Sequence, residues 1–206
     1  MAHASDPFFR TFHALRIKGF AKVDTIAEVA DLPVTVVDEH LSGLQQREWA
    51  MFREARQLWQ LTPVGREEHR LSLTEDVGNL RLSADLGEAY RAFLTINAQF
   101  KALCGDWQLC GDGPNDHGNA DYDAAVVRRL VTLNSETLPV VGQMGEVLAR
   151  LAPYGPRLAQ TCQRVLKGET NMFTGVMCGS YHDVWMELHE DLIITQGIDR
   201  VAEGSF

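Results

Sequence analysis

The stretch Thr25-Ile-Ala-Glu-Val-Ala-Asp-Leu-Pro33 decides how we interpret the fold of this 206-residue chain. Ile26, Val29 and Ala30 fall on one side at helical spacing, which predicts a short helix from Ile26 to Ala30. Leu32-Pro33 then interrupts that helix, and proline suits the first turn of a new one because it lacks a backbone N–H. We therefore expect two short helices joined by a tight turn that contains proline.

Helices are predicted on both sides of this turn. Before it, apolar residues recur at near-helical spacing and Gly19 supplies a stop; they are Phe8, Phe9, Phe12, Leu15 and Ile17. After Pro33, a helix should extend to about Gln46. The apolar face of this third helix consists of Val37, Leu41 and Leu44.

Two short aromatic-rich runs follow the third helix, residues 49–53 and 58–62, with polar residues 54–57 between them. Runs of this length and composition around a polar turn predict a β-hairpin. Thr62-Pro63 then combines a capping hydroxyl with a proline, so another helix should begin there.

The order of three helices, with a proline-containing turn, and then a hairpin is that of a winged helix-turn-helix. At this point the chain resembles the MarR-type and related winged-helix transcriptional regulators. Residues 25–30 resemble the first helix of the family's turn unit, and Val37, Leu41 and Leu44 match core positions of its recognition helix. Leu61-Thr-Pro-Val-Gly-Arg66 is similar to the Leu-Thr-x-x-Gly segment that follows the family's wing. The resemblance covers about a third of the chain and implies a DNA-binding domain over residues 1–70.

Such domains place the third helix in the major groove of double-stranded DNA, where outward side chains meet base edges. From the phase of the apolar face, the outward residues are Thr35, Val36, Asp38, Glu39, Ser42 and Gln46. Arg47 should reach the phosphate backbone from the helix end. Arg53 and Arg56 should do so from the wing.

Several residues depart from the family's pattern. Asp38 and Glu39 stand where these regulators usually carry Ser, Thr, Arg or Lys, and Glu48 stands where the family usually has glycine. The net charge is −9, but residues 1–70 carry nine Lys and Arg against ten Asp and Glu. The acidic excess therefore lies in residues 71–206, with ten basic and eighteen acidic residues.

From Leu71 onward the sequence predicts only helices and loops, with Pro139 kinking or ending a helix that begins at Asp121. We therefore predict a mostly α protein: an N-terminal winged helix-turn-helix with a small β-hairpin wing, and a C-terminal helical bundle over residues 71–206. Family regulators dimerise through helices outside the winged helix, so the resemblance implies a homodimer. Modulation by a small-molecule effector in the helical domain is a further hypothesis.

The segment 181–191 holds the candidate for that effector site. On a helix, His182, Trp185, Met186 and His189 fall at i, i+3, i+4 and i+7, which would form one mixed aromatic and polar wall. The two histidines are two turns apart, about 10–11 Å, too far to chelate one ion as an i, i+4 pair does. The alternatives are an amphipathic helix with an ordinary buried face and a metal site.

Catalytic motifs are absent: the chain has no G-x-S-x-G, no Walker loop, no dinucleotide-binding glycine pattern and no H-E-x-x-H. We therefore expect a regulator with no catalytic residues, bound metal or cofactor. The runner-up is a winged-helix module that binds protein without DNA. The third reading is a metal-dependent or acid–base enzyme centred on His182, Glu187 and His189.

The remaining composition suits a cytoplasmic protein. Hydrophobic residues make up 45% of the chain, enough for a packed core, and no apolar run approaches the roughly 20 residues of a membrane-spanning helix. Its four cysteines form no C-x-x-C pair, so reduced thiols are expected. The first ten residues lack the apolar stretch of a secretion signal.

Overall fold

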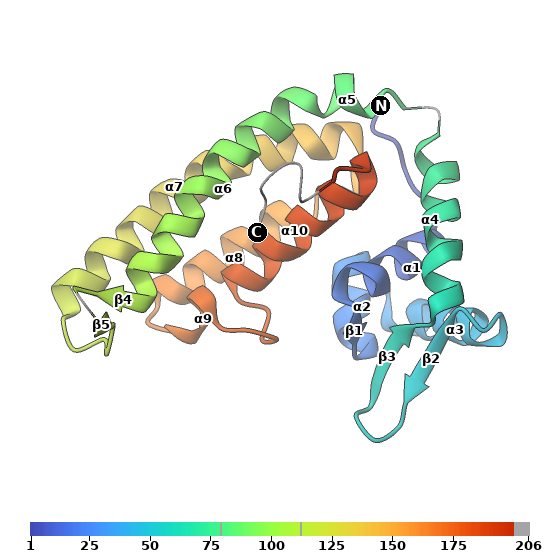
Figure 1. Cartoon of the computed structure of the whole chain (residues 1–206), viewed down its shortest axis with the longest axis horizontal. Helices are drawn as coiled ribbons and strands as arrows, with labels where there is room; N and C mark the ends of the chain where they lie inside the picture. Colours follow the sequence, from blue (N-terminus) through green and yellow to red (C-terminus); the bar gives the residue numbers. More distant parts are fainter. Residues whose placement is uncertain (79, 112, 200–206) are drawn as a thin grey trace.

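The computed structural model describes residues 1–78, 80–111 and 113–199. It is mostly helical, with a small three-stranded antiparallel sheet among the N-terminal helices (Figure 1). The N-terminal elements are α1 Pro7–Lys18, β1 Phe20–Ala21, α2 Val23–Ala30, α3 Val34–Gln46, β2 Ala50–Arg53, β3 Leu58–Leu61 and α4 Pro63–Val77. The elements that follow are α5 Leu82–Asp85, α6 Gly87–Gln108, β4 Leu109–Cys110, β5 Gly113–Pro114, α7 Ala120–Val147, the 3-10 helix η1 Ala149–Leu151, α8 Tyr154–Leu166, α9 Asn171–Thr174 and α10 Tyr181–Gln196.

The first hydrophobic core lies between α1, α2, α3 and the sheet. Helix α1 begins where the Asp6 carboxylate accepts hydrogen bonds from the backbone N–H groups of Phe8 and Phe9, and it ends at Gly19, whose φ is 71°. The predicted apolar face of α3 is confirmed, because all three of its residues are fully buried: Val37, Leu41 and Leu44. The three N-terminal helices therefore form where the sequence predicts them.

The predicted hairpin is also confirmed, and it gains a third strand. Strands β2 and β3 pair antiparallel, with Ala50 opposite Leu61 and Arg53 opposite Leu58. The two residues of β1 pair with the other edge of β3, which places β3 in the centre of the sheet. A two-residue strand carries too little alternation to be recognised from the sequence.

The start of α4 depends on close contact with the sheet. The Thr62 side chain caps the helix by accepting a hydrogen bond of 2.9 Å from the backbone N–H of Gly65. A Cβ atom at Gly65 would lie 1.8 Å from the carbonyl oxygen of Trp49, a distance that only glycine avoids. This contact explains physically why residue 65 of this chain is glycine.

We predict that Gly65→Ala destabilises the protein by about 1–3 kcal/mol, because the added methyl group must push α4 away from residue 49. Urea unfolding followed by circular dichroism measures the difference. Gly142→Ala is the matched control, because it lies in α7 with open space around its Cβ position and should gain up to about 1 kcal/mol from helix propensity. Equal stability of the two variants would refute the close contact.

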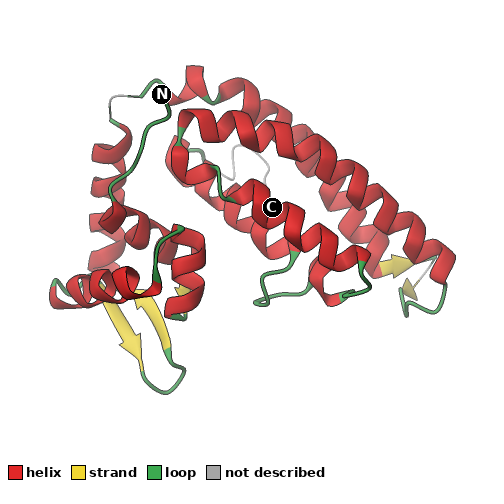
Figure 2. Ribbon diagram, turned by 180° about the vertical axis from the view of Figure 1, so that it is seen from behind, coloured by secondary structure: helices red, strands yellow, loops and turns green. Residues whose placement is uncertain are grey.

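The second hydrophobic core lies among the long helices α6, α7, α8 and α10 (Figure 2). The sequence predicts that Pro139 kinks or ends its helix. Helix α7 continues through Pro139, so the predicted end is wrong. Pro139 and Ser135 are both exposed. The Ser135 carbonyl that loses its helical donor therefore faces solvent, which lowers the cost of the missing hydrogen bond.

Helix α4 packs against α1 of the N-terminal elements and contacts the second core at its end. Helix α4 runs across the expected domain boundary at residue 70 and ends at Val77, which packs against the second core. Residues 200–206 of the predicted helical domain lie outside the described residues. None of the described helices is long and apolar enough to cross a membrane.

Candidate nucleic-acid interface

The outward face of α3 is open to solvent. Five of its six predicted base-contacting residues are exposed, namely Thr35, Asp38, Glu39, Ser42 and Gln46, and Val36 is half-buried. Both views of the molecule place α3 and the β2–β3 hairpin on the side away from the long helices α6 and α7 (Figures 1 and 2). The bundle therefore does not cover the surface that these residues form.

The turn of the hairpin carries two exposed arginines. Arg53 ends β2, and Arg56 lies in the four-residue turn that leads to β3. Among the described residues, neither guanidinium has an ion pair. Because their charges are not neutralised within the chain, they are available to an external anion.

Arg47 is held differently from the wing arginines. Its guanidinium lies over the rings of Phe8 and Trp49, at 4.8 and 5.1 Å from their centroids. This stacking fixes the guanidinium at the C-terminal end of α3, beside the base of the hairpin. Glu48, the next residue, has a φ of 60°, in the region that glycine favours.

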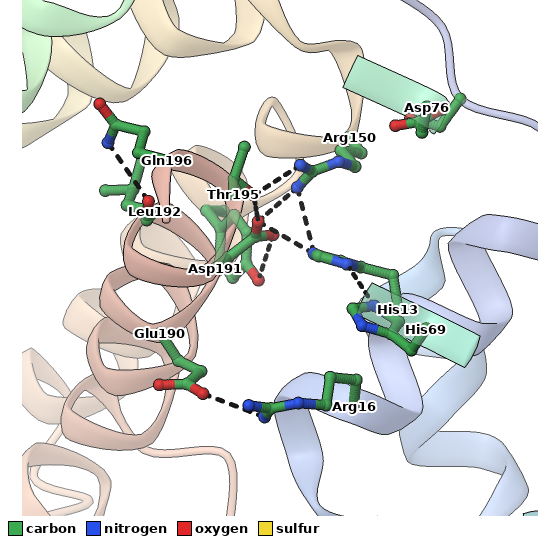
Figure 3. A network of polar contacts seen from close by, with 12 residues as sticks. His13, Arg16, His69, Asp76, Arg150, Glu190, Asp191, Leu192, Thr195 and Gln196 are labelled. Carbon is green, nitrogen blue, oxygen red and sulfur yellow. Dashed lines mark hydrogen bonds and ion pairs between the residues drawn. The ribbon is translucent and has the colours of Figure 1, made fainter. Parts of the chain in front are cut away.

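Behind the exposed face, a buried polar junction joins the two cores (Figure 3). The Asp191 carboxylate of α10 accepts hydrogen bonds from His13 of α1 at 3.0 Å, from Tyr154 of α8 at 3.2 Å and from Arg150 of η1. Thr195, one turn further along α10, binds both Asp191 and Arg150. The carboxylate is thereby paired with elements from both ends of the chain.

The junction extends to α4 through a second histidine. His13 Nδ1 lies 3.0 Å from His69 Nε2. Because the Asp191 carboxylate can only accept hydrogen bonds, His13 carries its proton on Nε2, and its Nδ1 accepts a hydrogen bond from His69. This order of donors is compatible with two neutral imidazoles.

The pKa directions agree with neutral histidines beside an ionised acid. Burial lowers the pKa of His69 to about 2, and the neighbouring His13, Arg16 and Arg150 act in the same direction. Burial also lowers the pKa of His13, although Asp191 opposes this effect. For Asp191, burial alone would raise the pKa, but Arg150 and His13 hold it well below its usual range.

Further ion pairs flank the junction on the side towards α2. Glu187 of α10 binds Lys18 of α1 at 2.5 Å and Arg157 of α8 at 2.7 Å, and it is almost fully buried. Arg157 also reaches Glu28 of α2 at 3.2 Å. Arg16 pairs with Glu190 at 3.0 Å (Figure 3). These contacts tie α1 and α2 to the helical bundle.

The segment before α1 contacts the C-terminal end of α4. The backbone of His3 exchanges hydrogen bonds with Val147 and Ala149, and the side chains of His3 and Ser5 bind Asp76 of α4 at 3.1 and 2.8 Å. The chain before α1 therefore lies between α4 and the 3-10 helix that carries Arg150.

Three of the four residues of the expected ligand wall, His182, Trp185 and His189, lie against α6, and Met186 does not. Trp185 and His189 are buried against Phe93, and the Trp185 indole N–H donates to Asn97 at 2.8 Å. His182 is half-buried near Phe100, at 6.3 Å between ring centroids. Met186 is exposed and lines a groove that faces the N-terminal elements. Helix α10 packs against several neighbours, so its periodicity alone does not define one ligand-facing side.

Within the described residues, no three His, Cys, Asp or Glu side chains converge as metal ligands would. Glu187, proposed above as an acid or base in the enzyme alternative, has its carboxylate occupied by Lys18 and Arg157. No family model, curated protein or solved structure matches the chain.

We predict that Asp191→Ala destabilises the protein by about 3–5 kcal/mol, because it leaves the buried Arg150 without its counter-ion. Glu146→Ala, at an exposed position on α7, is the control and should change stability by less than about 0.5 kcal/mol. Urea unfolding measures both. Similar effects of the two substitutions would show that the junction does not contribute in this way.

The neutral histidines also predict acid sensitivity. The pKa of a histidine in the unfolded chain is near 6.5, whereas the pKa of His69 in the folded protein is about 2. Between these two pH values the unfolded state binds a proton at this residue and the folded state does not. Stability is therefore fully present above about pH 6.5 and falls as the pH is lowered. For His69 alone the loss from pH 7.5 to 5.5 is about 1.4 kcal/mol.

Unfolding curves at the two pH values measure this dependence. His69→Gln should reduce the loss by about that amount, although the variant starts from a lower stability. His117→Gln, in the exposed loop before α7, controls for the removal of one imidazole at the surface. An unchanged pH dependence in His69→Gln would contradict the assigned protonation.

Proposed function

We propose that residues 1–77 form a winged helix-turn-helix that binds double-stranded DNA, and that the protein is a transcriptional regulator. The observation that carries this proposal is the exposed α3 face beside a hairpin with two unpaired arginines, on the side away from the long helices. The element order α1, β1, α2, α3, β2, β3, α4 matches the order that such modules have.

The proposed binding mode separates phosphate contacts from base contacts. Arg53 and Arg56 neutralise phosphates beside the groove that α3 enters, and this supplies most of the affinity. Ser42 and Gln46 offer hydrogen bonds to base edges from the exposed face of α3. Asp38 and Glu39 accept hydrogen bonds from cytosine N4 and repel the backbone elsewhere, so they favour a particular sequence over general DNA affinity.

The junction behind α1 and α4 supports this mode by fixing the module on the helical bundle. Duplex recognition by a homodimer requires two modules at a set spacing, because successive half-sites lie one helical turn apart, about 34–36 Å. A homodimer that assembles through the helical region would provide that spacing. Analytical ultracentrifugation of the free protein and of its DNA complex measures the stoichiometry.

The DNA proposal is tested by charge reversal on the wing. We predict that Arg53→Glu combined with Arg56→Glu weakens binding to duplex from the protein's own promoter region by at least tenfold. The slope of log K against log salt concentration should fall in magnitude by about 2, one for each lost phosphate contact. Fluorescence anisotropy over a salt series measures both quantities.

The matched control reverses two exposed arginines of the bundle, Arg91 on α6 and Arg128 on α7. It changes the net charge by the same amount and should leave binding within about twofold. If wild-type protein shows no salt-dependent duplex binding, the DNA proposal is wrong. The alternative, a winged-helix module that binds protein, is then the better interpretation. If both double variants lose affinity equally, net charge and not the wing governs binding.

A further inference from the structure

One flank of α3 lies against the first turns of α1 and carries His40. The Nδ1 atom of its imidazole lies 2.9 Å from the hydroxyl oxygen of Thr11, a fully buried residue of α1. The imidazole also meets the ring of Phe8 edge-on, with 5.4 Å between the two centroids. These two contacts fix the orientation of the imidazole at the border of the exposed α3 face.

The hydrogen bonds of Thr11 determine which nitrogen of His40 carries the proton. The Thr11 hydroxyl donates to the backbone carbonyl of Pro7, one turn earlier in α1, at 3.4 Å. Because this bond uses the only hydroxyl proton, the Thr11 oxygen accepts from His40, and the neutral imidazole carries its proton on Nδ1. The Nε2 atom then presents a lone pair. It has no partner among the described residues, and it is not among their buried unpartnered atoms.

Arg47 lies on the same flank, about two helical turns after His40. Its guanidinium lies over the ring of Phe8 at 4.8 Å, so Phe8 contacts both the imidazole and the guanidinium. The acidic residues of α3 point elsewhere. At 100° per residue, Asp38 and Glu39 are turned from His40 by about 160° and about 100° around the helix axis.

The charged and titratable residues of the neighbouring elements decide the net charge of this flank. The elements that pack against α3 carry Asp6, Arg10, His13, Arg16 and Lys18 in or next to α1, Asp24 and Glu28 in α2, and Arg53 in β2. Those that face away from α3 are His13, Arg16, Lys18 and Glu28, which pair with the bundle, and Asp24, which lines a groove towards it. Arg10 pairs with Asp31 at 3.3 Å. Asp6 keeps its negative charge while it caps α1 and offsets Arg47, so a proton on His40 makes the flank positive.

We propose that His40 and Arg47 form a phosphate clamp on this flank of α3, in which His40 takes up a proton when DNA binds. A phosphodiester oxygen only accepts hydrogen bonds, so Nε2 binds it after taking a proton from solvent. The resulting cation donates on both sides, from Nδ1 to Thr11 and from Nε2 to the phosphate. The negative phosphate favours this protonated form. The inference deepens the proposed DNA binding and rests on it.

The phosphate clamp and the wing contribute to DNA affinity in different ways. The wing arginines stay charged at every pH at which the protein is folded, so their phosphate contacts do not change with pH. The charge of a histidine can change between pH 5 and 8. DNA affinity should therefore rise as the pH falls, and this rise should depend on His40 and not on Arg53 or Arg56.

Proton uptake is measured as the change of duplex affinity with pH at constant salt. We expect the wild type to bind duplex from its own promoter region about threefold to tenfold more tightly at pH 6 than at pH 8. His40→Gln should bind equally at both pH values and more weakly than the wild type at pH 6, because its side chain gains no charge. His40→Lys should bind tightly at both, because it supplies a permanent cation. Fluorescence anisotropy measures the affinity, and circular dichroism confirms that each variant is folded.

Two variants serve as controls for the pH dependence. His117→Gln removes an imidazole from the exposed loop before α7, far from α3 in the sequence, and should keep the wild-type ratio of affinities. Arg53→Glu combined with Arg56→Glu should bind more weakly at both pH values and keep the same ratio. A wild-type ratio in His40→Gln, or loss of the ratio in His117→Gln, would overturn the phosphate clamp.

The assigned proton has a test that needs no DNA. In ¹⁵N-resolved NMR spectra of the free protein at pH 8, His40 should be the Nδ1–H tautomer, and addition of duplex at pH 7 should protonate Nε2. An Nε2–H tautomer in the free protein would overturn the proton uptake. If the wild type binds duplex with the same affinity at both pH values, the phosphate clamp is wrong and the proposed function stands. If it binds no duplex at all, both are wrong.

Discussion

An ionised carboxylate out of reach of water must be paired, and Asp191 finds its partners on both halves of the molecule. His13 reaches it from the first helix, while Arg150 and Tyr154 reach it from the helical bundle. His69 adds α4 to the same chain of hydrogen bonds. Because each hydrogen bond is directional, the junction permits one placement of the N-terminal module against the bundle. With apolar contact alone, the module could slide over the bundle surface.

Desolvating an ion pair costs much of the energy that its attraction returns, so such pairs often add little net stability. We interpret the junction as a device that selects an arrangement. It keeps the bundle packed against α1 and α4, and thereby leaves α3 and the hairpin uncovered. The open groove next to Met186 is a second result of the same arrangement, since its walls come together only when the two halves are in this position.

Local sequence patterns predicted the N-terminal elements well because their causes are local. The Gly65 contact, the Asp6 cap and the apolar face of α3 all act within one element or between neighbours. The junction escaped prediction because His13 and Asp191 are 178 residues apart, and nothing in either helix indicates the other. A histidine at position 13, among the buried apolar residues of α1, was the one available signal. The expected wall on α10 is covered by α6, because Phe93 and Phe100 of that helix pack against Trp185.

Helix α4 packs against α1 and reaches the second core at Val77, and this limits how the two halves can move. A continuous helix resists bending, so the main freedom left to the N-terminal module is rotation about a hinge near Val77. The hydrogen bonds from His3 and Ser5 to Asp76 restrict rotation at that hinge. If the junction opened, the module would turn as a rigid arm, in which a small angular change at the hinge becomes a larger displacement at the hairpin tip.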